Sequence, residues 1–465
     1  MVEDANPSDI QQIVARQRAF FATGALRDVG ARREALASLT QAIERRQEAI
    51  ARALAADLGK PRFEAYATEI GFVVSELREA ASKVERWARP KRVLPGLFSL
   101  PGSAAIQPDP LGVVLIIGPW NYPFQLLMAP LVGALAAGDC AVLKPSELTP
   151  HTSAVIAELI AQTFNPGHVT CVQGGVETGK LLLEERWDHV FFTGSTGVGR
   201  LVMQAAARHL TPTTLELGGK SPTIVEADAD LHIAARRIAW GKLVNAGQTC
   251  IAPDFLWVQE SVKPAFVEML REAITRSVGA DPRQSPAYAR IVSPRHAERL
   301  GRLLEGSAVL FGGEVIPEER YVAPTLVEGV GWDHPLMQEE IFGPILPILT
   351  YRSLDQILPQ INARPKPLAL YLFTRDEATV ERVLRETTSG GACINDVAMH
   401  FSVPSLPFGG VGESGTGAYH SERSFITFSH MKSVLRRGTW ADPSLRYPPW
   451  TERSVALVKR AFGMR

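Results

Sequence analysis

The 465-residue chain lacks long apolar runs, and neither sign of charge is in excess. No apolar segment reaches the roughly 18 residues that a membrane-spanning helix needs, so we expect no membrane span. Lysine plus arginine number 49, as do aspartate plus glutamate, which removes any whole-molecule attraction to nucleic acid or anionic lipid. The N-terminus shows no basic-then-apolar signal pattern, so we expect a cytoplasmic protein.

Cysteine is also scarce. The four cysteines stand at positions 140, 171, 250 and 393, and none forms a C-x-x-C pair. This number is too small for a disulfide framework in so long a chain, and we expect no metal site. Because most buried thiols are inert small hydrophobes, each cysteine needs further context before it indicates chemistry.

What the chain does contain is typical of a folded α/β protein, with 46% hydrophobic and 21% charged residues. The first 90 residues predict helices, with an apolar face repeating every three or four residues. Residues 91–111, broken by Pro and Gly, predict an extended hairpin or arm. Short apolar runs then alternate with helical segments, which indicates parallel sheets. The expected strands include residues 112–118, 140–143, 169–173, 190–193, 222–225, 255–258 and 369–373.

Three polar residues stand at positions suited to chemistry. Cys250 follows a turn that contains Gly247, where the backbone can approach a ligand closely. Glu216 lies between two leucines at a strand end, where burial should raise its pKa toward the range of a general base. Asn121 follows the strongest strand and could donate to an oxyanion. Plainer alternatives are a structural thiol, a cap or ion pair of Glu216 with Lys220, and a turn asparagine between two prolines.

Two glycine-rich segments compete as phosphate-binding loops. Residues 410–415 (GVGESG) match the dinucleotide-binding pattern G-x-G-x-x-G, but neither a strand nor a β-α-β unit surrounds them. Residues 192–199 (FTGSTGVG) follow a strand and open a helix, which is the context that phosphate binding requires. We therefore favour the second segment. Lys144 and Glu147, after another strand, could hold ribose hydroxyls or could be ordinary surface charges.

Together these segments resemble the aldehyde dehydrogenase superfamily, and most of all its class-3 branch of enzymes for fatty and aromatic aldehydes. Seven motifs occur in the family's order: residues 119–123 (PWNYP), 143–147 (LKPSE), 192–199, 215–222 (LELGGKSP), 247–250 (GQTC), 338–344 (QEEIFGP) and 406–412 (LPFGGVG). The class-3 likeness rests on residues 239–242 (AWGK), 249–254 (TCIAPD), 395–396 (ND) and 446–449 (RYPP).

The resemblance implies NAD(P)-dependent oxidation of medium- or long-chain aliphatic or aromatic aldehydes to acids. Cys250 would be the nucleophile and form a thioester, Asn121 and the Cys250 N–H would hold the oxyanion, and Glu216 would activate water. The free thiol has a pKa near 8.5, so we expect the site to lower it. NAD is the expected cofactor, with NADP also accepted. The residues expected to bind it are Trp120, Lys144, Glu147, Gly194, Ser195, Gly199, Leu217, Gly218, Glu340 and Phe342.

The resemblance also implies an aldehyde dehydrogenase-like fold of two Rossmann-like lobes plus a small β arm. We expect a cofactor-binding domain at residues 1–90 and 112–215 and a catalytic domain at 216–417. An oligomerisation arm is expected at 91–111 and 418–440, in a homodimer, followed by a tail at 441–465 that forms a docking helix. Two alternatives stay open. One is a CoA-acylating aldehyde dehydrogenase, and the other is a catalytically silent structural relative.

Overall fold

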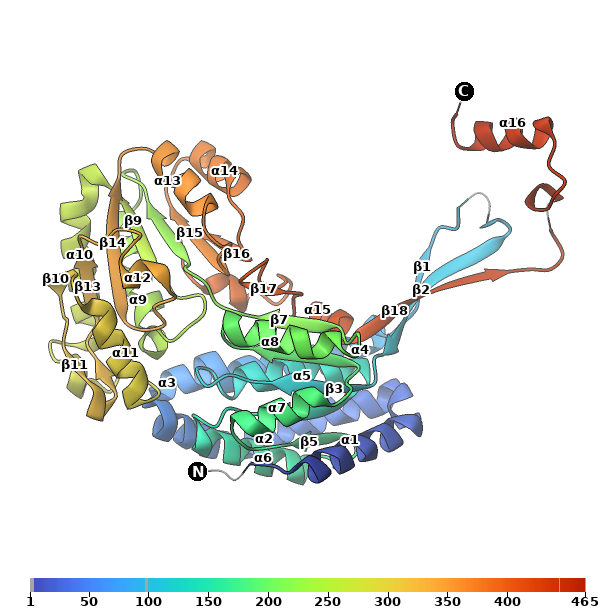
Figure 1. The fold of residues 1–465 in the computed structure, drawn as a ribbon, viewed down its shortest axis with the longest axis horizontal. Helices are drawn as coiled ribbons and strands as arrows, with labels where there is room; N and C mark the ends of the chain where they lie inside the picture. The colour runs from blue at the N-terminus through green and yellow to red at the C-terminus, as the bar shows by residue number, and fades with distance from the viewer. Residues whose placement is uncertain (1–3, 97–98, 443, 465) are drawn as a thin grey trace. The chain divides into compact units, whose positions relative to one another are not determined.

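The computed structural model describes residues 4–96, 99–442 and 444–464, which form two compact units. The first unit comprises the described residues of Met1–Trp87 and Pro110–Ser429 and contains two large sheets. The second comprises those of Ala88–Asp109 and His430–Arg465. This mixed α/β architecture is the fold class that the alternating pattern predicts. Figure 1 traces the chain through its elements.

A six-stranded sheet forms the centre of one half of the first unit (Figure 1). Its strand order is β17-β7-β6-β3-β4-β5, and all neighbours are parallel except the short edge strand β17. Valine, isoleucine and leucine dominate the central strand because both faces of a parallel sheet are covered by helices. The strands are β3 (Val113–Ile117), β4 (Cys140–Lys144), β5 (Val169–Cys171), β6 (His189–Thr193), β7 (Thr213–Glu216) and β17 (Gly415–Thr416).

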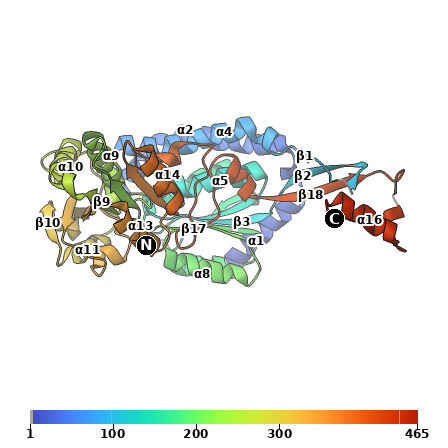
Figure 2. The ribbon, with the colours of Figure 1, turned by 90° about the horizontal axis from the view of Figure 1, so that it is seen from above.

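Helices cover both faces of this sheet, as the view in Figure 2 shows for α2 and α4 on one side and α8 on the other. Apolar side chains of α1, α7 and α8 join those of the strands in one buried cluster that includes Val14, Leu115 and Val202. Helix α5 packs on β3 and β4, with α2 and α4 behind it. The helices are α1 (Pro7–Ala22), α2 (Val29–Leu58), α3 (Arg62–Glu64), α4 (Gly71–Trp87), α5 (Gln125–Ala137), α6 (Pro150–Thr163), α7 (Val176–Glu184) and α8 (Thr196–Ala207).

A π-helical segment, η2 (Ala65–Ile70), connects α3 to α4. The long helix α2 ends at Gly59, which adopts the left-handed conformation that favours glycine. One face of this helix, formed by Leu36, Leu39, Ile43, Ile50 and Leu54, is fully buried. The helices and the apolar face predicted before residue 90 are therefore confirmed.

A seven-stranded sheet forms the other half of the first unit, with the order β10-β13-β14-β9-β8-β15-β16. Only the edge strand β10 runs antiparallel to its neighbour. The strands are β8 (Pro222–Val225), β9 (Phe255–Gln259), β10 (Ala308–Phe311), β13 (Thr325–Glu328), β14 (Ile345–Tyr351), β15 (Ala369–Phe373) and β16 (Gly391–Ile394); a separate pair is β11 (Val315–Ile316) with β12 (Tyr321–Val322). The main helices are α9 (Leu231–Leu243), α10 (Lys263–Val278), α11 (Pro294–Leu304), α12 (Pro335–Gln338), α13 (Leu354–Asn362) and α14 (Glu377–Glu386). The later helix α15 (Glu422–Thr427) packs against α5 and α4 of the other half.

The second unit is a three-stranded sheet, in the order β1-β2-β18, followed by a C-terminal helix. Strands β1 (Lys91–Val93) and β2 (Gly102–Pro110) pair antiparallel, which confirms the predicted hairpin. Strand β18 (Ser429–Arg437) lies at the edge, and α16 (Glu452–Ala461) has no buried residue. None of the helices in the described part of the chain combines the length and apolar character that a membrane span requires.

Candidate active site

The residues expected to carry chemistry follow the carboxyl ends of parallel strands in the six-stranded sheet. Asn121 comes after β3, Lys144 ends β4, Ser195 comes after β6, and Glu216 ends β7. The register aligns these ends, because Ile117 lies opposite both Lys144 and Phe192. In open α/β sheets, ligands bind at this edge. The strand topology therefore collects four of the predicted site segments at one edge.

Glu216 is a buried carboxyl group without a partner. It is 2% exposed, and no described residue offers a hydrogen bond to either carboxyl oxygen. Burial raises its pKa well above the ordinary value. The alternative of an ion pair with Lys220 is wrong, because the Lys220 ammonium pairs with Asp254. An unpaired buried carboxyl is costly for folding, so it points to a functional group.

Asn121 lies against the segment that leads to Cys250. Its side-chain nitrogen donates a hydrogen bond to the carbonyl of Gln248, at 3.0 Å. The neighbouring Tyr122 hydroxyl lies 2.7 Å from the Thr249 hydroxyl. These contacts bring the turn after β3 to the residues directly before the thiol. A lone turn asparagine would not require this burial, since Asn121 is 3% exposed.

The thiol of Cys250 is surrounded by groups that disfavour its charged form. Burial raises its pKa, and the carboxyl groups of Glu340 and Glu216 raise it further. The N–H groups of Cys250 and Ile251 act in the opposite direction, but more weakly. The expectation that the site lowers the pKa of this thiol is therefore wrong for this structure. The electrostatic effect of both carboxyl groups also shows that they lie near the sulfur.

Glu340 faces a cavity of about 220 Å³ that Gly218, Gly219 and Thr196 also line. Burial raises the pKa of Glu340 to about 8, with the nearby carboxylate of Asp254 as the next cause. The Gly219 N–H donates a hydrogen bond to the Glu340 carboxyl. A Cβ atom at position 218 would overlap that carboxyl, so the absence of a side chain there makes room for it.

The other residues expected at the cofactor form close pairs or helix-cap contacts. The Trp120 and Phe342 rings meet edge to face with centroids 5.2 Å apart, and Lys144 Nζ lies 3.0 Å from Glu147 Oε2. The Gly194 N–H donates to the Glu216 carbonyl, Ser195 caps the N-terminus of α8, and Gly199 packs against Leu217.

The cavity lining does not include Lys144, Glu147 or Cys250. The segment GVGESG at residues 410–415 forms a turn leading into β17, and no helix follows directly, so its rejection as a dinucleotide-binding turn agrees with the structure.

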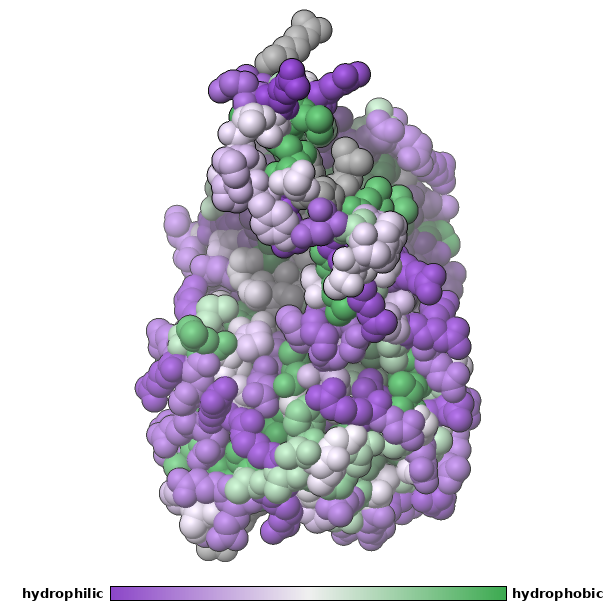
Figure 3. All heavy atoms as spheres, turned by 90° about the vertical axis from the view of Figure 1, so that its right-hand side faces the viewer, coloured by the Kyte–Doolittle hydropathy of each residue, from purple (hydrophilic) through white to green (hydrophobic). Residues whose placement is uncertain are grey.

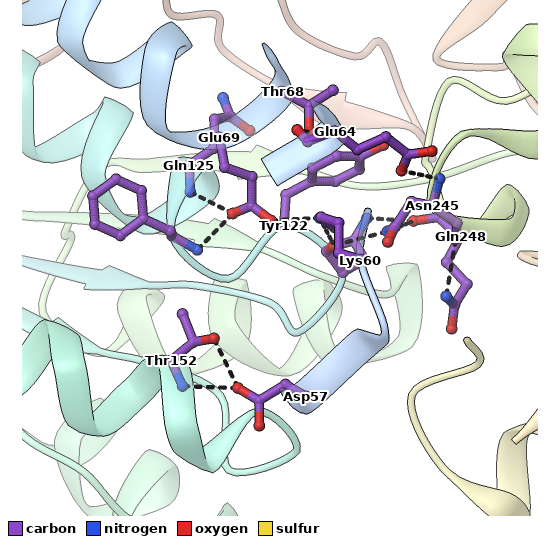
Figure 4. Close-up of polar contacts among 12 residues, drawn as sticks. Asp57, Lys60, Glu64, Thr68, Glu69, Tyr122, Gln125, Thr152, Asn245 and Gln248 are labelled. Carbon is purple, nitrogen blue, oxygen red and sulfur yellow. Dashed lines mark hydrogen bonds and ion pairs between the residues drawn. The ribbon is translucent and has the colours of Figure 1, made fainter. Parts of the chain in front are cut away.

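Further residues, which the sequence does not indicate, hold the backbone before Cys250 in place. Asn245, Ala246 and Gly247 all adopt left-handed backbone conformations before the thiol. Figure 4 shows Glu64 directed at Asn245, whose backbone N–H it accepts at 2.9 Å. Burial raises the pKa of Glu64 to about 7. Glu64 carries no local sequence signal, because its partner lies 181 residues away.

Comparison with known proteins decides the family. The family model described as "Aldehyde dehydrogenase family" matches residues 1–434. The chain belongs to this family. It is 46% identical to the 4,4'-diaponeurosporen-aldehyde dehydrogenase of Staphylococcus aureus, over 95% of this chain and 96% of that protein. It is also 46% identical to mouse aldehyde dehydrogenase family 3 member A2, over 97% and 93% of the two chains.

A third relative is the rat "Aldehyde dehydrogenase, dimeric NADP-preferring", 45% identical over 95% of this chain and 98% of that protein. Among solved structures, the substrate-bound S. aureus AldH aligns with a TM-score of 0.95 at 45% identity, covering 97% and 99% of the two chains. The NAD-dependent aldehyde dehydrogenase of Sinorhizobium meliloti aligns at 0.84 and 34% identity, covering 94% and 89%. The resemblance to this family and the predicted fold are therefore confirmed. The protein oxidises aldehydes to carboxylic acids with NAD or NADP.

The electrostatic influence of Glu340 on Cys250 can be measured by alkylation. At pH 9, above the pKa of about 8 of Glu340, most of this carboxyl carries a charge that disfavours the thiolate. We expect Glu340→Gln to react with iodoacetamide at Cys250 several times faster than the unaltered protein, followed by peptide mass spectrometry. Glu339→Gln, at the exposed neighbouring carboxyl, is the matched control and should leave the rate unchanged. Equal rates in all three proteins would contradict this electrostatic contact.

Proposed function

We propose that this aldehyde dehydrogenase forms a thioester on Cys250 and that Glu216 activates the water that hydrolyses it. The observation that supports this most is the unpaired, buried carboxyl of Glu216 within electrostatic reach of the Cys250 sulfur. A general base must be free to take a proton, and burial, by raising the pKa of this unpaired carboxyl, makes it a stronger base than an exposed glutamate. The assignment of both residues follows the family motifs at residues 215–222 and 247–250.

In the first step, the Cys250 thiolate attacks the aldehyde carbon, a C–S bond forms, and the carbonyl π electrons move to oxygen. The Asn121 amide and the Cys250 N–H stabilise this oxyanion without changing their own protonation. A bound nicotinamide cofactor would supply the acceptor for the hydride that leaves the same carbon, while the oxyanion electrons re-form the C=O bond of the thioester. In the last step, Glu216 takes a proton from water, the water oxygen attacks the thioester, and the C–S bond breaks to release the acid.

The cavity beside Glu340 suits one ribose of a nicotinamide cofactor, the adenosine half of which would lie outside this cavity. A carboxyl can accept hydrogen bonds from ribose hydroxyls, and the glycines at 218 and 219 let a ligand approach the backbone. In this proposal Glu340 and Phe342 hold the nicotinamide ribose and ring, and Trp120 contacts Phe342. Further residues hold the adenosine half: Lys144 and Glu147 at its ribose, and Gly194, Ser195, Gly199 and Leu217 near the pyrophosphate. This set follows the expectation from the sequence.

We propose medium- or long-chain aliphatic or aromatic aldehydes as substrates. In this proposal, a cluster of aromatic rings lines the approach to the thiol: Phe72 packs on Phe401 at 5.6 Å and on His420 at 5.2 Å, and Phe408 stacks on His420. Apolar walls favour long or aromatic side groups through burial. The S. aureus relative is named for a diaponeurosporen-aldehyde. Steady-state kinetics with aldehydes from C2 to C16 and with benzaldehyde test this specificity.

Substitutions of the two proposed residues give different outcomes. Cys250→Ala should abolish aldehyde oxidation while NAD⁺ binding persists, because only the nucleophile is lost. Glu216→Gln should give one burst of NADH followed by a stall, because the thioester still forms but is no longer hydrolysed. Rapid-mixing absorbance at 340 nm measures both, and the slow phase of the unaltered enzyme should accelerate as the pH rises above the ordinary glutamate range. Turnover by Cys250→Ala would contradict the proposal.

The same assay separates the alternatives. NADH formation without CoA supports hydrolysis at Glu216, whereas NADH that requires CoA would identify an acylating enzyme. No NADH with any aldehyde and either cofactor would identify a silent structural relative.

We propose NAD as the preferred cofactor, with NADP also accepted, because the Glu147 carboxylate repels a 2′-phosphate. Glu147→Gln should therefore raise kcat/KM with NADP⁺ relative to NAD⁺ by about tenfold, which corresponds to ~1.4 kcal/mol. Glu158→Gln, on the exposed part of the following helix α6, is the control that retains the original ratio. The rat relative named NADP-preferring makes this ratio informative, and a preference of the unaltered enzyme for NADP⁺ would overturn the ranking.

We also propose a homodimer formed through the second unit. The edge strand β18 offers unpaired backbone groups, and the unit exposes apolar side chains that include Met431, Leu435 and Trp440. Figure 3 shows hydrophobic side chains at the surface between hydrophilic ones. The rat relative is named dimeric. A cytoplasmic location stays our proposal, and the four free cysteines suit a reducing compartment.

Sedimentation should give twice the chain mass of 50.7 kDa. Met431→Asp/Leu435→Asp should lower this to a single chain, because a desolvated charge opposes association. Leu384→Asp, on the exposed face of α14 in the first unit, should sediment as the unaltered protein does. A dimer that survives the double substitution would place the interface elsewhere.

A further inference from the structure

A buried ion pair lies behind the turn that carries Asn121. Lys60 Nζ contacts Glu69 Oε1, and both side chains are fully buried. Lys60 follows helix α2 and Glu69 belongs to η2, so the pair joins two parts of the helical layer. Figure 4 shows both side chains directed toward the segment that begins at Tyr122. This location connects the pair to the proposed oxyanion site.

Glu69 holds the beginning of helix α5. Its second oxygen accepts the backbone N–H of Phe124 at 2.9 Å and that of Gln125 at 3.1 Å. The first N–H groups of a helix have no partner within the helix, and a carboxylate there also interacts favourably with the helix dipole. Glu69 therefore fixes the backbone only three residues after Asn121.

Lys60 holds the backbone of Asn121 itself. Its ammonium donates to the Asn121 carbonyl at 3.2 Å and lies 4.1 Å from the centre of the Tyr122 ring. The same carbonyl accepts the side-chain N–H of Asn245 at 2.8 Å. The Asn121 main chain is thus held from the helical layer on one side and from the segment before Cys250 on the other.

Stability alone does not account for such a pair. Removing two charges from water is costly, and a well-packed apolar pair is often about equally stable. What charged groups add is direction, because each hydrogen bond requires a defined position of its partner. Here the hydrogen bonds and the ring contact that the pair makes with other residues all involve residues 121–125, within the described part of the chain.

We propose that Lys60 and Glu69 are positioning residues for aldehyde oxidation. They hold the backbone at residues 121–125 so that the Asn121 amide faces the oxyanion formed on the carbon bound to Cys250. This inference rests on the proposed function. A displacement of a catalytic group by about 1 Å can cost on the order of 100-fold in rate, so a support of this kind has a measurable effect.

The test variant is Lys60→Met/Glu69→Gln, which removes both charges together and retains an oxygen facing the Phe124 and Gln125 N–H groups. We expect it to slow the NADH burst about 10- to 100-fold while the dissociation constant for NAD⁺ stays unchanged. The effect should also nearly vanish when Asn121 is already alanine, because both changes act on one interaction.

The matched control is Asp57→Asn. Asp57 is another buried carboxylate in the helical layer, and it accepts the backbone N–H groups of His151 and Thr152 at the start of α6. Figure 4 shows Asp57 beside Thr152. Its contacts do not include residues 121–125, so this variant should lower the melting temperature without slowing the burst.

A burst at the unaltered rate, or losses that simply add to those of Asn121→Ala, would overturn the positioning role; so would an equal slowing in Asp57→Asn. If the double variant does not fold, Glu69→Gln alone is combined with Asn121→Ala in the same comparison, and the same outcomes decide. An unaltered enzyme that forms no NADH would refute the proposed function and this inference together, whereas normal turnover with unaffected variants refutes the inference alone.

Discussion

The parallel arrangement of β3, β4, β6 and β7 is the constraint on which the site depends. Parallel strands place all their carboxyl ends at one edge, so segments that are far apart in the sequence become neighbours there. The turn at Asn121 and the carboxyl of Glu216 reach the same edge although 95 residues separate them. The seven-stranded sheet then supplies Glu340 from the loop before β14. Each sheet therefore contributes groups that neither would bring together alone.

Burial determines the electrostatic character of this site. Desolvation is the largest cause of the raised pKa values of Glu64, Glu216 and Glu340, and of the Cys250 thiol. Carboxyl groups whose pKa lies near neutrality, such as those of Glu64 and Glu340, can exchange protons at physiological pH, which an ordinary exposed glutamate does less readily. The same burial opposes formation of the thiolate. The site therefore combines groups suited to proton transfer with a nucleophile whose activation requires an additional favourable interaction.

Local sequence patterns were sufficient for the strands and the carboxyl-edge residues, because these depend on short-range periodicity. The run at residues 112–118 predicted β3, and the position of Glu216 between leucines predicted its burial. The support behind the site could not be predicted in this way. Glu64 and Asn245 are 181 residues apart, and nothing in either local segment indicates the other. The thiol pKa was predicted in the wrong direction, because its burial, and next the nearness of Glu340 and Glu216, arise only on folding.

The segment before Cys250 shows why this long-range support is needed. Asn245 and Ala246 adopt left-handed conformations, which cost of order 1–3 kcal/mol for residues other than glycine. Such a conformation persists only where surrounding contacts stabilise it. Here Glu64 accepts the Asn245 N–H, and the Gln248 side chain donates to the carbonyls of Asn245 and Arg290. The position of the sulfur is consequently a property of three distant segments folding together, not of the motif that surrounds it.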